Sequence, residues 1–148
     1  MLRLAKTVLG IILRHPLTGT TIVPVLPDGR IVLVRRRDTG RWSLPGGLVD
    51  WGEDITTTVT RELKEETGLD LLNIRRLVGV YSSLARDPRM HSISVLVAAE
   101  VQGEFKIQDQ AEITDVSGFS PETIPFGELS HDHDQQLQDY FQGLTTIA

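Results

Sequence analysis

Three glutamates, Glu62, Glu65 and Glu66, follow Arg61 closely in the sequence. On an α-helix, positions i, i+3 and i+4 lie on one side, so the three carboxylates would be near neighbours. Like charges at this spacing repel by roughly 0.2–0.5 kcal/mol per pair. A hard divalent cation reverses that sign, because it neutralises the cluster and takes carboxylate oxygens as ligands. The spacing therefore predicts a Mg²⁺ or Mn²⁺ site, and with it phosphate chemistry.

The residues around the glutamates make this prediction more specific. The segment resembles the signature of the Nudix hydrolases, G-x5-E-x7-R-E-U-x-E-E-x-G-U, in which U is a bulky aliphatic residue. Every specified position is filled, by Gly47, Glu53, Arg61, Glu62, Leu63, Glu65, Glu66, Gly68 and Leu69. Chance agreement at all these positions is on the order of one in a million or rarer. The resemblance implies the Nudix fold and an enzyme that hydrolyses phosphorus-containing anhydrides.

The resemblance also implies roles for individual residues. The expected metal ligands are Glu62, Glu65 and Glu66, with the main-chain carbonyl of Gly46 as a further candidate, and the expected cofactor is Mg²⁺ or, alternatively, Mn²⁺. Glu53 and Arg61 complete the catalytic set by fixing the liganding carboxylates. The general base comes either from this cluster or from Glu112, which matches a place where many relatives carry an additional acidic residue. An exposed loop residue is the alternative interpretation of Glu112.

The stretch Arg86-Asp87-Pro88-Arg89 is similar to a loop of the ADP-ribose pyrophosphatases. Arg86 and Arg89 would bind phosphate or ribose oxygens through charge-assisted hydrogen bonds. Alternatively, Asp87 pairs within its own loop and Pro88 stiffens it. Leu84 stands where ADP-ribose enzymes usually carry a proline, so the substrate stays open.

Three further features allow two interpretations each. Arg35 and Arg37 share one face of a predicted strand, and they either meet substrate phosphate or are solvated at the strand end. Trp42 and Trp51 flank the signature glycines, and packing in the core or at its rim is favoured over base stacking. The segment 131–134, His-Asp-His-Asp, is either a second metal site or, as we favour, a helix cap and surface segment.

The composition limits the classes of protein and partner. A chain of 148 residues with 40% hydrophobic content suits a single domain over 1–148. The absence of cysteine fits a reducing, cytoplasmic location, and the net charge of −5 argues against nucleic-acid binding. No apolar run is long enough to cross a bilayer. Residues 1–14 are interpreted as a folded amphipathic segment rather than a signal peptide, because Arg3 and Lys6 interrupt it. We expect a small nucleotide diphosphate substrate, no nucleic acid, no membrane partner, and compatibility with a homodimer.

The pattern of the chain predicts the elements that position these residues. Strands at 20–26 and 30–35 should form a hairpin around Pro27-Asp28-Gly29, with Pro24 marking an edge or bulge. A short strand at 42–47 should precede a helix at 54–67 that stops at Gly68. Strands near 74–82, 93–101 and 116–119 and a helix near 134–143 complete the chain. This mixture predicts an α/β fold, an α/β/α sandwich with a mixed sheet.

One face of the predicted helix at 54–67 carries both apolar residues and the candidate metal ligands. Ile55 and Val59 fall beside Glu62 and Glu66 on a helical wheel, so the first half can anchor the carboxylates of the second. The leading interpretation is a Mg²⁺-dependent Nudix pyrophosphohydrolase acting on ADP-ribose or a related nucleotide. The alternatives are a pyrophosphohydrolase of oxidised (d)NTPs and a non-catalytic, Nudix-like nucleotide-sensing domain.

Overall fold

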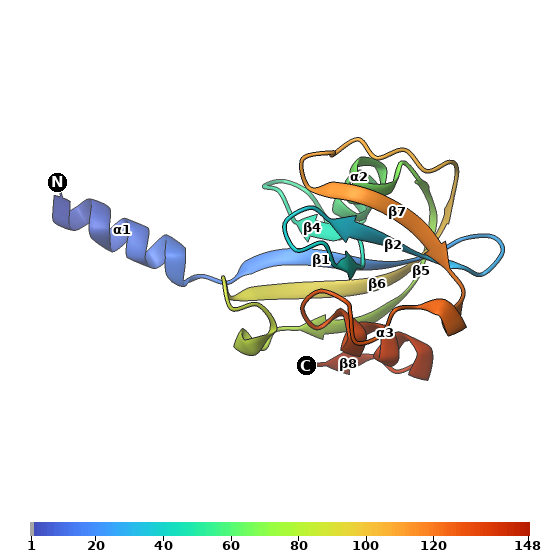
Figure 1. Ribbon diagram of the computed structural model, residues 1–148. Coiled ribbons are helices and arrows are strands. Elements are labelled where there is room, and N and C mark those ends of the chain that lie inside the picture. Colours follow the sequence, from blue (N-terminus) through green and yellow to red (C-terminus); the bar gives the residue numbers. More distant parts are fainter. Residues whose placement is uncertain (1) are drawn as a thin grey trace.

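A mixed β-sheet with a helix on each face forms the body of the protein (Figure 1). The computed structural model describes residues 2–148. Within them the sheet order is β3-β2-β1-β6-β5-β8, β4 pairs with β1, and β7 pairs with β2. The strands are β1 (Leu17–Val25), β2 (Ile31–Arg36), β3 (Trp42–Ser43), β4 (Gly46–Leu48), β5 (Asp70–Tyr81), β6 (Ser92–Gln102), β7 (Ile113–Phe119) and β8 (Thr146–Ile147). The helices are α1 (Leu2–Arg14), α2 (Ile55–Thr67) and α3 (His133–Gln142), with short 3-10 turns at Leu84–Arg86 and Pro121–Thr123.

The predicted hairpin exists, but Pro24 lies neither at an edge nor at a bulge. Strand β1 is central, and Pro24 pairs in parallel register with Ala99 of β6. On its other side β1 pairs with β4 up to Thr21 and with β2 only from Val25. Pro24 occupies the gap between these two partners, where the missing N–H removes no ladder bond. A break in pairing inside a central strand is therefore enough to accommodate a proline.

The helix of the signature begins and ends where its sequence predicts. Asp54 caps the N-terminus, and its carboxylate accepts a hydrogen bond from the backbone N–H of Thr57 at 2.7 Å. Gly68 ends the helix in the left-handed conformation with φ 81°, and a Cβ there would collide with the backbone of Lys106. These two residues fix the length of α2 and hence the position of the glutamates on it.

The two faces of the sheet each carry a hydrophobic core. Helix α2 covers one of them, where Val59 and Leu63 pack against Ile22 and Val97. Helix α3 covers the other, where Leu137 joins a cluster that contains Leu33 and Tyr81. Because buried apolar side chains line both faces, the predicted α/β/α sandwich with a mixed sheet is confirmed.

Helix α1 differs from the rest of the chain in its packing. The amphipathic segment is helical as expected, but Figure 1 shows it projecting beyond the end of the sheet. It contributes no described residue to either core cluster. Within residues 2–148, no helix is long and apolar enough to cross a membrane.

Candidate active site

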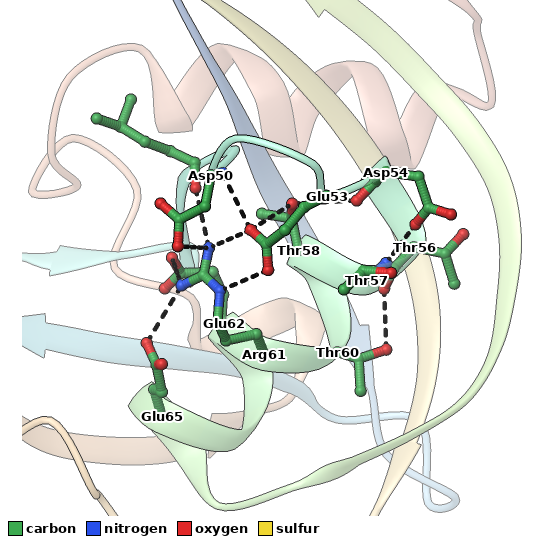
Figure 2. A network of polar contacts seen from close by, with 11 residues as sticks. Asp50, Glu53, Asp54, Thr56, Thr57, Thr58, Thr60, Arg61, Glu62 and Glu65 are labelled. Carbon is green, nitrogen blue, oxygen red and sulfur yellow. Dashed lines mark hydrogen bonds and ion pairs between the residues drawn. The ribbon is translucent and has the colours of Figure 1, made fainter.

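The guanidinium of Arg61 is the centre of a polar network that joins α2 to the loop before it (Figure 2). Its Nε and Nη2 donate to the two carboxylate oxygens of Glu53 at 2.9 and 2.8 Å. Its Nη1 donates to Glu62 at 2.8 Å and to Glu65 at 3.3 Å. Its Nη2 also donates to the main-chain oxygen of Leu48 at 3.0 Å. One side chain thus holds two of the predicted metal ligands and ties them to Glu53.

Both carboxylate oxygens of Glu53 accept hydrogen bonds in this network. Besides Arg61, it accepts hydrogen bonds from the backbone N–H of Asp50 at 3.0 Å and from the hydroxyl of Thr58 at 3.2 Å. Arg61 above all, with these two donors, lowers the pKa of Glu53 to about 2. Glu53 therefore stays ionised and acts by positioning Arg61.

Two of the predicted ligands are buried carboxylates. Glu66 is only 3% exposed, and among residues 2–148 its one hydrogen-bond donor is the backbone N–H of Gly46, at 3.1 Å. Burial, with the nearby charge of Glu62, raises the pKa of Glu66 to about 8. Burial also raises the pKa of Glu62, against the opposing effect of Arg61. The protein keeps two acidic groups in a place where their charges are costly without a cation.

The signature glycines allow the backbone to approach these carboxylates. A Cβ on Gly47 would collide with the carboxylate of Glu62, and a Cβ on Gly46 would collide with the main-chain oxygen of Thr20. Any side chain at either position would push β4 away from α2 or from β1. The glycines therefore set the distance between the backbone of β4 and the acidic face of α2.

A cavity of about 470 Å³ opens beside this network. Residues of β1, β4 and α2 line one part of it, among them Gly46, Gly47, Glu62 and Glu65. The other part is lined by basic and histidine side chains from distant segments, namely Arg36, Arg86, Arg89, His131 and His133. Its size and its mixture of charges suit a small anionic ligand together with cations.

The donor set is suited to a hard divalent ion. Carboxylate oxygens and the nearby main-chain carbonyl of Gly46 are the oxygen donors that Mg²⁺ and Mn²⁺ prefer. Among residues 2–148, no three acidic or histidine side chains converge on a common metal position. Arg61 explains this arrangement, because it draws the carboxylates of Glu62 and Glu65 to its own Nη1. A change of rotamer at Glu65, whose side chain is 40% exposed, would release its oxygens.

Arg86 is held by the protein itself. Its side chain is only 9% exposed and forms an ion pair with Asp132 at 2.7 Å. Its Nη1 also donates to the main-chain oxygens of Tyr81 and Ser92, at 3.0 and 3.3 Å. These partners join β5, β6 and the start of α3. These contacts give Arg86 a structural role, and because Arg86 also lines the cavity the predicted substrate contact stays a prediction.

Arg89 and Asp87, from the same loop, are more accessible. Arg89 is half-exposed and pairs with Asp87 at 2.9 Å, which lowers the pKa of Asp87 to about 2. A second carboxylate, Asp38, lies 3.7 Å from Arg89. The predicted pairing of Asp87 within its own loop is confirmed, and Arg89 still faces the cavity.

The arginines of β2 are arranged differently from the prediction. Arg35 stacks over Trp42 with 5.5 Å between the guanidinium carbon and the ring centroid, and Arg37 donates to the main-chain oxygen of Gln110. Neither lines the active-site cavity, whereas Arg36 does. Side chains alternate across a strand, so the residue between the two predicted ones points into the site. The sequence contained that signal, but not which face of β2 is the functional one.

Glu112 and Asp109 both line the cavity, and the Glu112 side chain is exposed. The charge of Glu112 contributes to the raised pKa of Glu66, which shows that the two groups are close. The position of Glu112 is therefore compatible with the predicted role of base or ligand.

Sequence reasoning missed Thr20 behind the cavity and did not predict the contacts that His133 and Asp132 make there. The hydroxyl of Thr20 is buried, lines the cavity and has no hydrogen-bond partner among the described residues 2–148. His133 is buried and its Nδ1 accepts the backbone N–H of Leu44 at 3.0 Å. Asp132, at the start of α3, makes no side-chain cap and instead holds Arg86. The preferred interpretation of 131–134 as a cap and surface segment holds for Asp132, which occupies the N-cap position, and for the exposed His131, but it is wrong for His133, which is buried behind the cavity.

The family model of the NUDIX domain matches residues 15–140. An ADP-ribose pyrophosphatase of Methanocaldococcus jannaschii is 40% identical over 119 residues, which cover 78% of this chain and 68% of that protein. The crystal structure of an ADP-ribose pyrophosphatase from Streptococcus suis is similar with a TM-score of 0.73 and 28% identity, over 90% of this chain and 100% of that one. That of a MutT NUDIX hydrolase from Burkholderia pseudomallei has a TM-score of 0.74 and 28% identity, over 85% and 98%. With the signature complete and its Gly47, Arg61, Glu62 and Glu65 lining one cavity, the chain belongs to the Nudix family of hydrolases, which act on pyrophosphate bonds.

Proposed function

We propose that this protein is a Mg²⁺-dependent pyrophosphohydrolase that cleaves ADP-ribose or a closely related nucleoside diphosphate linked to a sugar. The observation that carries the proposal is the mixed lining of the cavity. Glu62 and Glu65 of α2 line it together with Arg36 and Arg89, which come from distant segments. A diphosphate bridge needs cations near the oxygens that develop charge and basic side chains at its ends.

Different residues of the chain would have different roles in such a reaction. Glu62, Glu65 and Glu66, with the carbonyl of Gly46, would hold the ion, and Arg61 with Glu53 fixes the orientation of the carboxylates. Bound Mg²⁺ screens the phosphate oxygens and lowers the pKa of an attacking water. Glu112, which lines the cavity, would accept the proton of that water. Attack at phosphorus breaks one phosphorus–oxygen bond of the anhydride and leaves a phosphate on each product.

The substrate class is supported by three features. The M. jannaschii relative is an ADP-ribose pyrophosphatase, and 40% identity over most of this chain makes the same substrate the first to test. Arg89 is half-exposed and faces the cavity from the loop that resembles those enzymes. The unpartnered hydroxyl of Thr20 offers one further hydrogen bond to a phosphate or ribose oxygen.

A product assay tests this proposal. Purified protein is incubated with ADP-ribose, a sugar nucleotide, a dinucleotide or an oxidised dNTP, with Mg²⁺ or with EDTA, and the products are separated by anion exchange. We expect AMP and ribose 5-phosphate from ADP-ribose with Mg²⁺, and no turnover with EDTA. Tight binding without turnover of any of these compounds would identify a nucleotide sensor instead.

A pair of glutamate variants provides the matched control. Glu65→Gln removes a proposed ligand, whereas Glu104→Gln removes the same charge at an exposed position outside the cavity. Turnover should fall strongly in the first variant and stay unchanged in the second. Equal turnover in both would contradict the role of Glu65.

A further inference from the structure

Helix α1 presents one broad apolar face and one basic face. At about 100° per residue, Leu4, Ala5, Val8, Leu9 and Ile11 fall within an arc of about 160°. The opposite arc carries the polar side chains Arg3, Lys6, Thr7 and Arg14. Leu4, Val8, Leu9 and Ile11 are all exposed, and Figure 1 shows the helix clear of the domain. Nothing in the described part of the chain covers this apolar face.

The charge of this segment is opposite to that of the protein. The chain has a net charge of −5, yet no acidic residue occurs before Asp28. Every charged side chain of α1 is basic. A helix with a wide apolar face and a basic polar face is the type that lies in the interface of an anionic bilayer.

The end of the domain next to α1 is also apolar at its surface. Leu17 begins β1 directly after the helix, and its neighbour in the sheet is Ser92, just after the exposed Met90. Gly19 of β1 pairs with the exposed Leu48, and Trp51 follows in the next loop. Trp51 is fully exposed, so the expectation that it packs in the core or at its rim is wrong. Tryptophan in such a position is favoured where protein meets the headgroup region of a membrane.

The acidic residues near this end are partly neutralised. Asp87 pairs with Arg89, and Asp50, beside Trp51, lies 3.5 Å from Arg61. These contacts reduce the repulsion that an anionic surface would otherwise meet at the cavity mouth.

The dimensions favour a helix that lies on a bilayer. Thirteen residues of α-helix are about 20 Å long, whereas the hydrocarbon core of a bilayer is about 30 Å thick. A second copy of the chain could cover the apolar face, but it offers no acidic partner for Arg3, Lys6 and Arg14 within the same segment.

We propose that α1, together with Leu17, Leu48, Trp51 and Met90, docks on an anionic phospholipid surface. This inference goes beyond the hydrolase function and replaces the expectation of no membrane partner. Leu48 and Met90 also line the active-site cavity, so docking would turn the cavity mouth toward the headgroups.

Co-sedimentation with vesicles tests the proposal on the full chain. The protein should sediment with vesicles of phosphatidylcholine mixed with phosphatidylglycerol, and much less with phosphatidylcholine alone. Raising the salt concentration should release it, because the basic face contributes through charge. Each basic residue near an anionic surface contributes about fivefold to binding. The double variant Arg3→Gln with Lys6→Gln should therefore partition roughly 25-fold less.

Substitutions of apolar residues separate insertion from charge attraction alone. Val8→Asp should abolish vesicle binding, whereas Leu72→Asp, at a similarly exposed leucine near the start of β5 and the far end of the sheet from α1, should not change it. Trp51 emission should shift to shorter wavelength with anionic vesicles, and Trp51→Phe should remove that shift. Both aspartate variants should keep the activity of the parent chain, since neither residue lines the cavity.

Two results would overturn the inference. One is equal, weak sedimentation with both vesicle types and an unchanged Trp51 emission. The other is a dimer in solution that Val8→Asp dissociates and that does not bind vesicles, because a second copy would then cover the helix. Neither result depends on which nucleotide the enzyme hydrolyses.

Discussion

The two sides of the cavity are built in different ways. The acidic side, formed by Gly46, Gly47, Glu62 and Glu65, comes from one continuous stretch of some twenty residues. The basic side, formed by Arg36, Arg86, Arg89 and His131, comes from β2, the loop before β6 and the segment before α3. The first is visible as a spacing pattern, whereas the second exists only after the chain has folded.

The two sides also use their charges differently. Acidic side chains are kept buried or bound to Arg61 alone, which leaves them ready for a cation. Basic side chains are largely committed to carboxylates of the protein, as in the pairs of Arg86 with Asp132 and Arg36 with Asp38. We infer that catalysis depends mainly on the acidic side and that stability depends mainly on the basic side.

The largest effect is expected on the acidic side. Glu66→Gln should lower turnover by more than about 100-fold, since even residues that only support metal ligands contribute about 10–100-fold. The free energy of unfolding without metal should stay equal or rise, because a buried carboxylate and its repulsion with Glu62 are removed. Steady-state kinetics and urea unfolding measure the two quantities. If the variant is less stable but keeps its activity per folded molecule, Glu66 contributes to stability rather than to catalysis.

The next largest effect is expected at Arg86. Arg86→Ala leaves Asp132 without its partner in a largely buried place and should lower the free energy of unfolding by about 3–5 kcal/mol. A double-mutant cycle of Arg86→Ala and Asp132→Asn, measured by thermal unfolding, isolates the interaction energy of the pair. If stability is unchanged and only the KM rises, Arg86 is a substrate contact as the sequence first suggested.

A pH dependence of stability is expected from His133. Burial, against the opposing charge of Asp132, lowers the pKa of His133 to about 3, and His131, Arg86 and Arg36 act in the same direction as burial. Between pH 3 and about 6.5 the unfolded chain binds more protons at this residue, so stability falls as the pH falls. The loss between pH 7 and pH 5 is about 2 kcal/mol for this group.

Comparison with His133→Gln isolates that contribution, because the carboxylates titrate alike in both proteins. Urea unfolding at pH 7 and pH 5 should show a smaller difference in the variant. Identical differences would mean that His133 binds its proton as readily in the folded state as in the unfolded chain.

The smallest effect is expected at Arg89. Its half-exposed side chain pairs only with exposed or loop carboxylates, so Arg89→Ala should change stability by no more than about 0.5 kcal/mol. The KM for ADP-ribose should rise about tenfold with kcat nearly constant, as expected when one charged hydrogen bond to the substrate is lost. Unchanged kinetics would leave the basic side without a demonstrated substrate contact.

Much of the fold could be predicted because its signals are local. Helix α2 begins at the cap Asp54 and ends at Gly68, and both act through their own backbone neighbourhood. The two-residue strand β8 was not predicted, since it depends on pairing with Gly79 and Val80 of β5. The prediction that Pro24 marks an edge or bulge was wrong for the same reason. A proline fits in this central strand only because the neighbour of β1 changes from β4 to β2 at that point.

The sequence alone determined the acidic helix, because the spacing of its glutamates, its caps and its signature glycines all lie within one short stretch. Tertiary structure decided that Arg36 rather than Arg35 or Arg37 faces the cavity, since only the packing of the sheet distinguishes the two faces of a strand. It also decided that Arg86 is held by Asp132, a residue far along the chain. A local pattern specifies which groups can do chemistry, and the partners brought together by folding decide which of those groups remain free to do it.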